Sequence, residues 1–115
     1  MTCRNSSVLL LDLDTLRGRR TARALGDARC AVTVAHSVSE ALVFVAIHRP
    51  DAVIVTLASG HDLVSPASVL RELMPGVRII FTGSDDAAAI QVLEAGEDYV
   101  PRLSHAGLLA LRGKR

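Results

Sequence analysis

Three strongly apolar runs of the sequence end in, or are followed by, side chains that could take part in chemistry. These side chains are the carboxylates of Asp12 and Asp14 and the hydroxyls of Thr56 and Thr82. Neighbouring carboxylates can hold a divalent cation, but an aspartate between a strand and a helix can equally cap the helix. A threonine hydroxyl is neutral at pH 7 and is a poor nucleophile unless a base lies beside it. The pattern therefore favours a binding site over a catalytic centre.

The elements that must position these side chains alternate along the chain. Five runs have the length of a β-strand, namely Val8–Leu11, Cys30–Ala35, Ala52–Leu57, Val77–Phe81 and Asp98–Val100. The first, third and fourth runs are apolar almost throughout, which is typical of parallel strands that are covered on both faces. We therefore expect a buried, parallel sheet.

Five other stretches carry helix signals. The predicted helices are Leu16–Ala28, Val38–His48, Pro66–Met74, Asp86–Ala95 and Ser104–Arg112. The second has the strongest signals, because Ser37 and Glu40 form a capping box and Pro50 disfavours helix at the residue before it. Asp14 or Thr15 is the expected N-cap of the first helix, and Ser65 caps the third, with Pro66 at its first position.

Strands and helices alternate over all 115 residues and are joined by short connections. Right-handed crossovers place helices on both faces of such a sheet. The sequence therefore predicts one α/β domain over residues 1–115, a three-layer, doubly wound (βα)5 sandwich with a five-stranded parallel sheet. Ligands of such sheets bind beyond the carboxyl ends of the strands, where Asp12, Thr56 and Thr82 lie.

Composition excludes several classes of function. Half of the residues are apolar but only 3% are aromatic, and the formal net charge is +1. A nearly neutral chain has no overall field that favours nucleic acid or an anionic membrane. No apolar run approaches the roughly 20 residues that span a bilayer, and the first seven residues lack the apolar stretch of a signal peptide. Cys3 and Cys30 match no metal or redox spacing, so we expect reduced thiols in a cytoplasmic protein.

Several segments resemble the receiver domain of bacterial response regulators, in order and over nearly the whole chain. The segments are Leu9–Arg17, Ser39–Leu42, Arg49–Val55, Ile79–Gly83 and Leu93–Val100. In this order, they are similar to the first strand with its acidic turn, the second helix, the third strand, the fourth strand with its terminal hydroxyl residue, and the end of the fourth helix with the fifth strand. The resemblance implies a flavodoxin-like, receiver-like topology with strand order 2-1-3-4-5 and a part in two-component signal transduction.

The resemblance also implies how such a site works. Receivers accept a phosphoryl group from a histidine kinase on an aspartate that ends the third strand, with a divalent cation held by carboxylates and a lysine that neutralises the phosphoryl charge. In this sequence Thr56 falls at the phosphoacceptor position, and Arg102 takes the place of the lysine. Asp12 matches the first member of the acidic pair, Leu13 replaces the second, and Asp14 completes a residual acidic turn.

Two residues match the switch of the family, which reports the state of the site. Thr82 matches its hydroxyl residue and Tyr99 its aromatic residue, although packing alone could account for both. Magnesium prefers at least one or two carboxylate ligands, and threonine is a poor phosphoryl acceptor. We therefore predict a pseudo-receiver that has no catalytic residue, no metal and no cofactor.

Other polar residues have simpler explanations. A basic cluster on the first helix is either solvated or a surface for an acidic partner; its members are Arg17, Arg19, Arg20 and Arg23. The histidines show no ligand spacing and are expected to be exposed or locally hydrogen-bonded. They are His36, His48, His61 and His105.

The leading hypothesis is a phosphorylation-independent regulatory module that acts by homodimerisation or by docking a protein partner. The expected surface joins the fourth helix near Ile90–Glu94, the strand of Tyr99 and the last helix. An effector domain after Arg115 is possible, and transcription control is the commonest context of the family. The alternative is a small-ligand sensor that uses the crevice at the strand ends. An enzyme ranks last, because the sequence offers neither a nucleophile with a base nor a Gly-rich phosphate loop.

Overall fold

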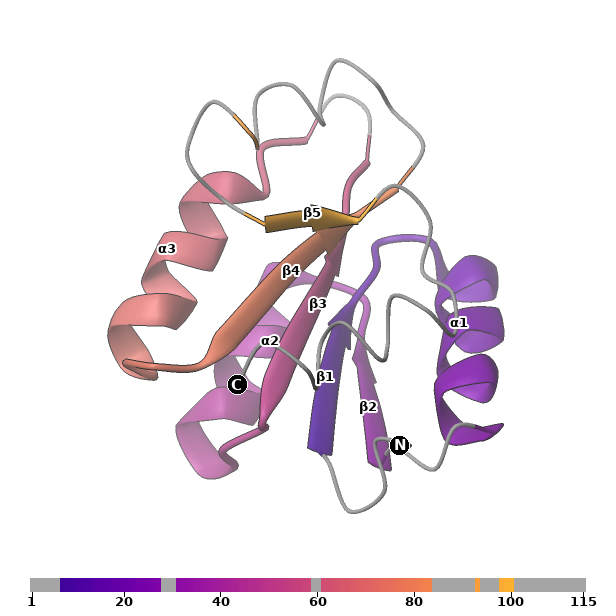
Figure 1. Ribbon diagram of the computed structural model, residues 1–115, viewed down its shortest axis with the longest axis horizontal. Helices are drawn as coiled ribbons and strands as arrows, with labels where there is room; N and C mark the ends of the chain where they lie inside the picture. Colours follow the sequence, from indigo (N-terminus) through magenta and orange to yellow (C-terminus); the bar gives the residue numbers. More distant parts are fainter. Residues whose placement is uncertain (1–6, 28–30, 59–60, 84–92, 94–97, 101–115) are drawn as a thin grey trace.

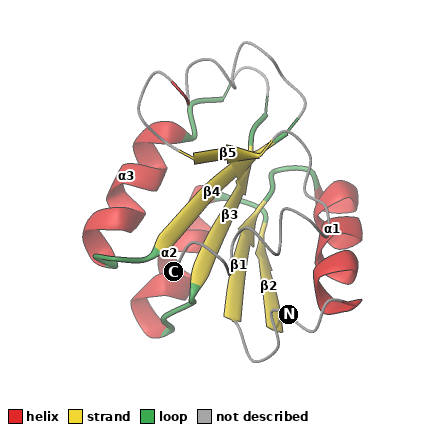
Figure 2. Cartoon of the chain, in the orientation of Figure 1, coloured by secondary structure: helices red, strands yellow, loops and turns green. Residues whose placement is uncertain are grey.

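The computed structural model describes residues 7–27, 31–58, 61–83, 93 and 98–100 (Figure 1). Its strands are β1 (Ser7–Leu11), β2 (Ala31–Ala35), β3 (Ala52–Thr56), β4 (Arg78–Thr82) and β5 (Asp98–Val100). Its helices are α1 (Thr15–Asp27), α2 (Val38–Ile47) and α3 (Val64–Leu73) (Figure 2). None of the helices in these ranges has the length and apolar character that crossing a membrane requires.

The strands form one parallel sheet in the order β2-β1-β3-β4-β5. The predicted order 2-1-3-4 of the first four strands is confirmed, and a short edge strand, β5, pairs with β4. The helices predicted at Asp86–Ala95 and Ser104–Arg112 lie outside the described residues, apart from residue 93. The complete (βα)5 repeat therefore stays a prediction.

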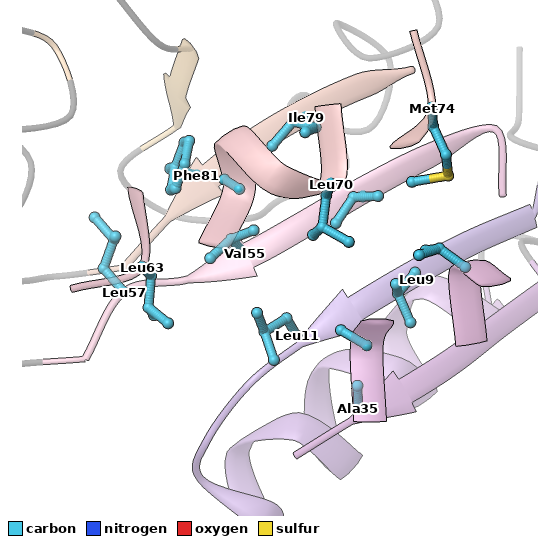
Figure 3. Packing of buried hydrophobic residues seen from close by; sticks show 14 residues of the cluster. Leu9, Leu11, Ala35, Val55, Leu57, Leu63, Leu70, Met74, Ile79 and Phe81 are labelled. Atoms are coloured by element: carbon cyan, nitrogen blue, oxygen red, sulfur yellow. The ribbon is translucent and has the colours of Figure 1, made fainter. Parts of the chain in front are cut away.

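Alternate side chains of the strands pack into two hydrophobic clusters, one on each face of the sheet. Helices α2 and α3 cover the larger cluster, which includes Leu9, Val55, Leu70 and Phe81 (Figure 3). Helix α1 covers the smaller cluster, which consists of Val8, Leu10, Leu25 and Ile54. Because both faces are covered, β3 is buried along its whole length, as its continuous apolar sequence predicts.

The predicted capping box of α2 is present in a modified form. The side chain of Ser37 accepts a hydrogen bond from the backbone N–H of Glu40 at 3.1 Å. The carboxylate of Glu40 accepts from the backbone N–H of His36 at 2.7 Å rather than from that of Ser37. The helix ends at Ile47, one residue before the predicted end.

The predicted start of α3 is wrong. The helix begins at Val64, and Ser65 lies inside its first turn instead of capping it. The carboxylate of Asp62 accepts hydrogen bonds from the backbone N–H groups of Val64 and Ser65 and from the Ser65 hydroxyl. Pro66 fits the first turn because the early N–H groups of a helix have no intrahelical partner.

Candidate functional site

The carboxyl ends of β1, β3 and β4 carry a row of three buried polar side chains. Asp12 is 0% exposed, and Thr56 and Thr82 are each 5% exposed. Thr56 is the register partner of Thr82, and Asp12 follows Leu11, the partner of Val55. Side chains alternate along a strand, so all three belong to the face that α1 covers. We call these residues the polar row.

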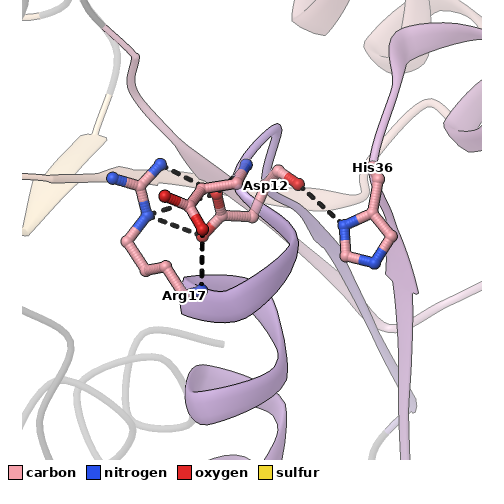
Figure 4. A network of polar contacts seen from close by, with 4 residues as sticks. Asp12, Arg17 and His36 are labelled. Atoms are coloured by element: carbon pink, nitrogen blue, oxygen red, sulfur yellow. Dashed lines mark hydrogen bonds and ion pairs between the residues drawn. The ribbon is translucent and has the colours of Figure 1, made fainter.

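The carboxylate of Asp12 is held by the guanidinium of Arg17 (Figure 4). The Nε of Arg17 donates to Oδ2 at 2.9 Å and to Oδ1 at 3.2 Å, and its Nη2 donates to Oδ1 at 2.8 Å. The backbone N–H of Asp14 donates to the same Oδ1 at 2.9 Å. The ion pair raises the pKa of Arg17, mainly through the side-chain hydrogen bonds to Asp12. The one carboxylate of the polar row therefore has a counter-charge from the chain itself.

The backbone of Asp12 is fixed as well. Its N–H donates to the carbonyl of Ala35 at 3.0 Å, and Nδ1 of His36 lies 3.1 Å from its carbonyl oxygen. A carbonyl oxygen can only accept, so Nδ1 of His36 is the donor. Gly18 makes the close approach of α1 possible, because a Cβ there would lie 3.2 Å from Cε1 of His36 and 3.4 Å from Cβ of Asp12.

Asp14 caps α1 rather than joining Asp12 in a cation site. Its carboxylate is exposed and accepts a hydrogen bond from the backbone N–H of Arg17 at 2.9 Å. That hydrogen bond is the main cause that lowers the pKa of Asp14 below its usual range. Of the two interpretations of the acidic turn, the helix cap is confirmed. Asp12, the other acidic residue of this turn, is paired with Arg17.

Leu13 contributes to packing at the position where the resemblance implies an acidic residue. It is half-buried and contacts the larger hydrophobic cluster, under α2 and α3. Thr56 and Thr82 have no hydrogen-bond partner for their hydroxyls among the described residues, although the carbonyl of Thr82 accepts from the N–H of Leu57 at 2.8 Å. The polar row thus contains one neutralised carboxylate and the hydroxyls of two largely buried threonines.

Tyr99 connects β5 to the segment after Thr82. Its hydroxyl donates to the carbonyl of Gly83 at 2.7 Å, and the side chain is half-buried. Gly83 has a φ of +146°, and a Cβ there would meet Leu57 at 3.4 Å. The Tyr99 hydroxyl therefore contacts the residue that follows Thr82, whereas the Tyr99 side chain packs against the larger cluster, on the opposite face of the sheet from Thr82. Arg102, the substitute for the lysine, lies outside the described residues.

A divalent cation does not fit this arrangement. Both oxygens of Asp12 already accept hydrogen bonds, and no group of three or more His, Cys, Asp or Glu in the described ranges could hold a metal ion. Mg²⁺ would need oxygen ligands at roughly 2.0–2.1 Å in octahedral geometry. The guanidinium of Arg17 lies against the carboxylate that such an ion would use.

The run of arginines in α1 predicts a surface cluster that includes Arg17, but it does not predict the contact of Arg17 with Asp12. All four arginines of that cluster are exposed, and Arg17 differs from Arg19, Arg20 and Arg23 by its ion pair with Asp12. The signal was present in the spacing. Arg17 lies in the first turn of the helix that directly follows the strand end, so its long side chain can reach back to Asp12. Of the histidines, His36 is locally hydrogen-bonded as expected, and His48 stacks on Phe44.

No protein-family model and no curated protein matches the chain. Solved structures do match. A Francisella response regulator receiver domain is 20% identical over 94% of each chain, with a TM-score of 0.75. A response regulator from Thermotoga maritima is 22% identical over 99% of this chain and 96% of that one, with a TM-score of 0.74. TrrA from Thermotoga maritima, solved in complex with Mg²⁺-BeF, is 17% identical over 95% and 96%, with a TM-score of 0.77.

These likenesses define the class of fold. The chain has the fold of response regulator receiver domains, as the sequence resemblance predicts. At these identities the likeness concerns the fold alone, and the chemistry must be argued from the residues of the polar row.

Proposed function

We propose that the chain is a receiver-like signalling module whose working state does not depend on phosphorylation. The observation that carries the proposal is the polar row. A threonine, Thr56, ends β3, and the row's only carboxylate, that of Asp12, is paired with Arg17.

The chemistry of phosphoryl transfer is poorly supported by these groups. Thr56 has a neutral hydroxyl, and no described base forms a hydrogen bond with it. Phosphoryl transfer also relies on cations that neutralise the charge developing on the transferred group. The structure of TrrA with Mg²⁺-BeF contains such a cation, whereas Arg17 already engages the carboxylate of Asp12 here. We infer a pseudo-receiver that is not an enzyme.

The module would act through protein contact, either with a second copy or with a partner, in the cytoplasm and as part of transcription control. Leu93, in the segment predicted for this contact, is a large apolar side chain that is 58% exposed. Strand β5 (Asp98–Val100), which carries Tyr99, is the other described part of that surface, and the remainder lies outside the described ranges.

Sedimentation velocity tests this proposal. The chain should show the same association state, or capture the same partner, with and without acetyl phosphate and Mg²⁺. A change of association state on adding the phosphodonor would refute phosphorylation independence.

The alternative, a small-ligand sensor, has one observation in its favour. The residues Thr56 and Thr82 are each 5% exposed, and no hydrogen bond from either hydroxyl to another described residue is observed. Such hydroxyls could donate a hydrogen bond to a neutral ligand or accept one from it. Saturable thermal stabilisation by a metabolite, abolished in Thr56→Val or Thr82→Val, would favour the sensor over the interaction module.

A further inference from the structure

We propose that Arg17 is a built-in counter-cation: its guanidinium takes the place beside Asp12 that a divalent metal ion would need, and so keeps such ions out of the polar row. This inference deepens the proposed function and rests on it for the assignment of the site. It explains how the charge of a buried carboxylate at the end of β1 is neutralised by the chain itself.

Arg17 and Asp12 have the geometry of a fully hydrogen-bonded ion pair. The carboxylate of Asp12 is fully buried, and burying a charge is costly unless it is paired and hydrogen-bonded. Arg17 provides both, with Nε 2.9 Å from Oδ2 and Nη2 2.8 Å from Oδ1. Together with the N–H of Asp14, these donors engage both carboxylate oxygens. A metal ion bound to either oxygen would also have to lie beside a fixed positive charge.

The first turn of α1, which carries Arg17, is fixed by hydrogen bonds on both sides. Asp14 accepts the backbone N–H of Arg17 through its side chain and the N–H of Gly18 through its carbonyl, both at 2.9 Å. On the other side of the turn, His36 binds the carbonyl of Asp12, and Gly18 packs closely against the His36 ring. The backbone that carries the Arg17 side chain is therefore fixed by several hydrogen bonds.

Arg17 differs from the other arginines of α1 in its contacts. Arg17 is the arginine of α1 for which a contact with an acidic side chain is observed in the described structure. Its side chain is 45% exposed, whereas that of Asp12 is 0% exposed, so the pair joins a solvent-accessible cation to a fully buried carboxylate. Unlike a metal ion, this counter-charge cannot be removed by a chelator and does not vary with cation concentration. The net charge of the polar row would therefore stay the same at any concentration of divalent cations.

The inference is tested in variants that carry a second carboxylate in the polar row, as an additional ligand for a cation. Thr56→Asp places a carboxylate beside Asp12 on the neighbouring strand. This single variant should still have a low affinity for Mn²⁺, because the positive charge of Arg17 remains. Thr56→Asp with Arg17→Gln should bind Mn²⁺ more tightly by about tenfold or more, because a neighbouring positive charge has been removed. Thr56→Asp with Arg19→Gln is the matched control and should behave like Thr56→Asp alone. Titration calorimetry and Mn²⁺ electron paramagnetic resonance measure the affinities.

Two outcomes would overturn the inference. One is saturable Mn²⁺ binding by the wild-type chain at the polar row; the other is equal affinity in Thr56→Asp and in its Arg17→Gln derivative. If Thr56→Asp with Arg17→Gln does not fold, the measurement is made on Thr56→Asp with Arg17→Lys instead. This variant keeps the positive charge and should still exclude the ion. An NMR spectrum of the wild-type chain adds a direct readout: the Nε–H of Arg17 should exchange slowly and be unaffected by Mg²⁺.

The inference and the proposed function fail separately. Cation binding without phosphoryl transfer would contradict the role of Arg17 and leave phosphorylation independence intact. Phosphoryl transfer to the wild-type chain would contradict the proposed function itself.

Discussion

Arg17 and Asp12 form a forked ion pair across the turn between β1 and α1, with Nη2 2.8 Å from Oδ1 and Nε 2.9 Å from Oδ2. The fork joins a half-exposed helix residue to a carboxylate that has no exposed surface. In an arrangement of this kind the two partners are not equivalent. Loss of the arginine leaves a buried charge, whereas loss of the carboxylate leaves a solvated cation.

Arg17→Gln should lower the free energy of unfolding by about 1–3 kcal/mol, less than for a fully buried pair because the arginine is partly exposed. Urea denaturation followed by circular dichroism measures the change. Arg19→Gln, an exposed substitution two residues along the same helix, should change stability by about 0.5 kcal/mol or less. Equal effects of the two substitutions would show that the ion pair is unimportant for stability.

Gly18→Ala and Gly26→Ala should have opposite effects although both glycines lie in α1. A Cβ at position 18 would meet His36 at 3.2 Å and Val34 at 3.3 Å, while at position 26 it would meet nothing within 4 Å. Overpacking of this kind costs about 1–3 kcal/mol, which exceeds the gain of about 1 kcal/mol in helix propensity. Gly26→Ala should therefore stabilise the protein and Gly18→Ala destabilise it, as measured by thermal unfolding. Stabilisation by Gly18→Ala would contradict the close approach of α1 to His36.

Asp62 should contribute to the acid sensitivity of the fold. The hydrogen bond from the Ser65 hydroxyl is the main cause that lowers the pKa of Asp62. A carboxyl whose pKa is lower in the folded state stabilises the fold above its unfolded pKa, and this contribution is lost as the pH falls through the folded pKa. An NMR titration should place the midpoint of Asp62 below the ordinary aspartate value of about 3.9. Ser65→Ala should move it upward; an unchanged midpoint would argue against this cap.

Much of the fold follows from local sequence signals, and the rest depends on contacts that no local signal encodes. Continuous apolar runs identified β1, β3 and β4, and the Ser37–Glu40 spacing identified the start of α2. Ser65 was mistaken for a cap because Ser-Pro is a strong helix-start signal, whereas Asp62, three residues earlier, makes the capping hydrogen bonds.

The sequence predicts where the candidate site lies, but it does not predict the ion pair that Arg17 forms there. Its place at the strand ends, with Asp12, Thr56 and Thr82 in one row, follows from the doubly wound topology. The role of Arg17 did not follow, because a charged residue in a helical repeat is usually solvated and the reach of its side chain depends on how closely Gly18 lets α1 approach the sheet.

Thr56→Asp alone should not make the chain a working receiver. One reason is that Leu13 offers no oxygen ligand to a metal ion. A second reason is that Arg17 already engages the carboxylate of Asp12. Incubation of this variant with acetyl phosphate and Mg²⁺ should leave its intact mass unchanged. Adding Leu13→Asp, Arg17→Gln and Arg102→Lys should be needed for slow phosphoryl transfer. Efficient labelling of Thr56→Asp alone would mean that one substitution separates the chain from a receiver that accepts phosphate.

The central claim is that the wild-type polar row does not take up a phosphoryl group. The most direct measurement is the intact mass of the wild-type chain after incubation with acetyl phosphate and Mg²⁺, alongside a receiver domain that is phosphorylated under the same conditions. We predict that the control gains the mass of one phosphoryl group and that this chain gains none. A stoichiometric gain that maps to Asp12, Asp14 or Thr56 would contradict the account.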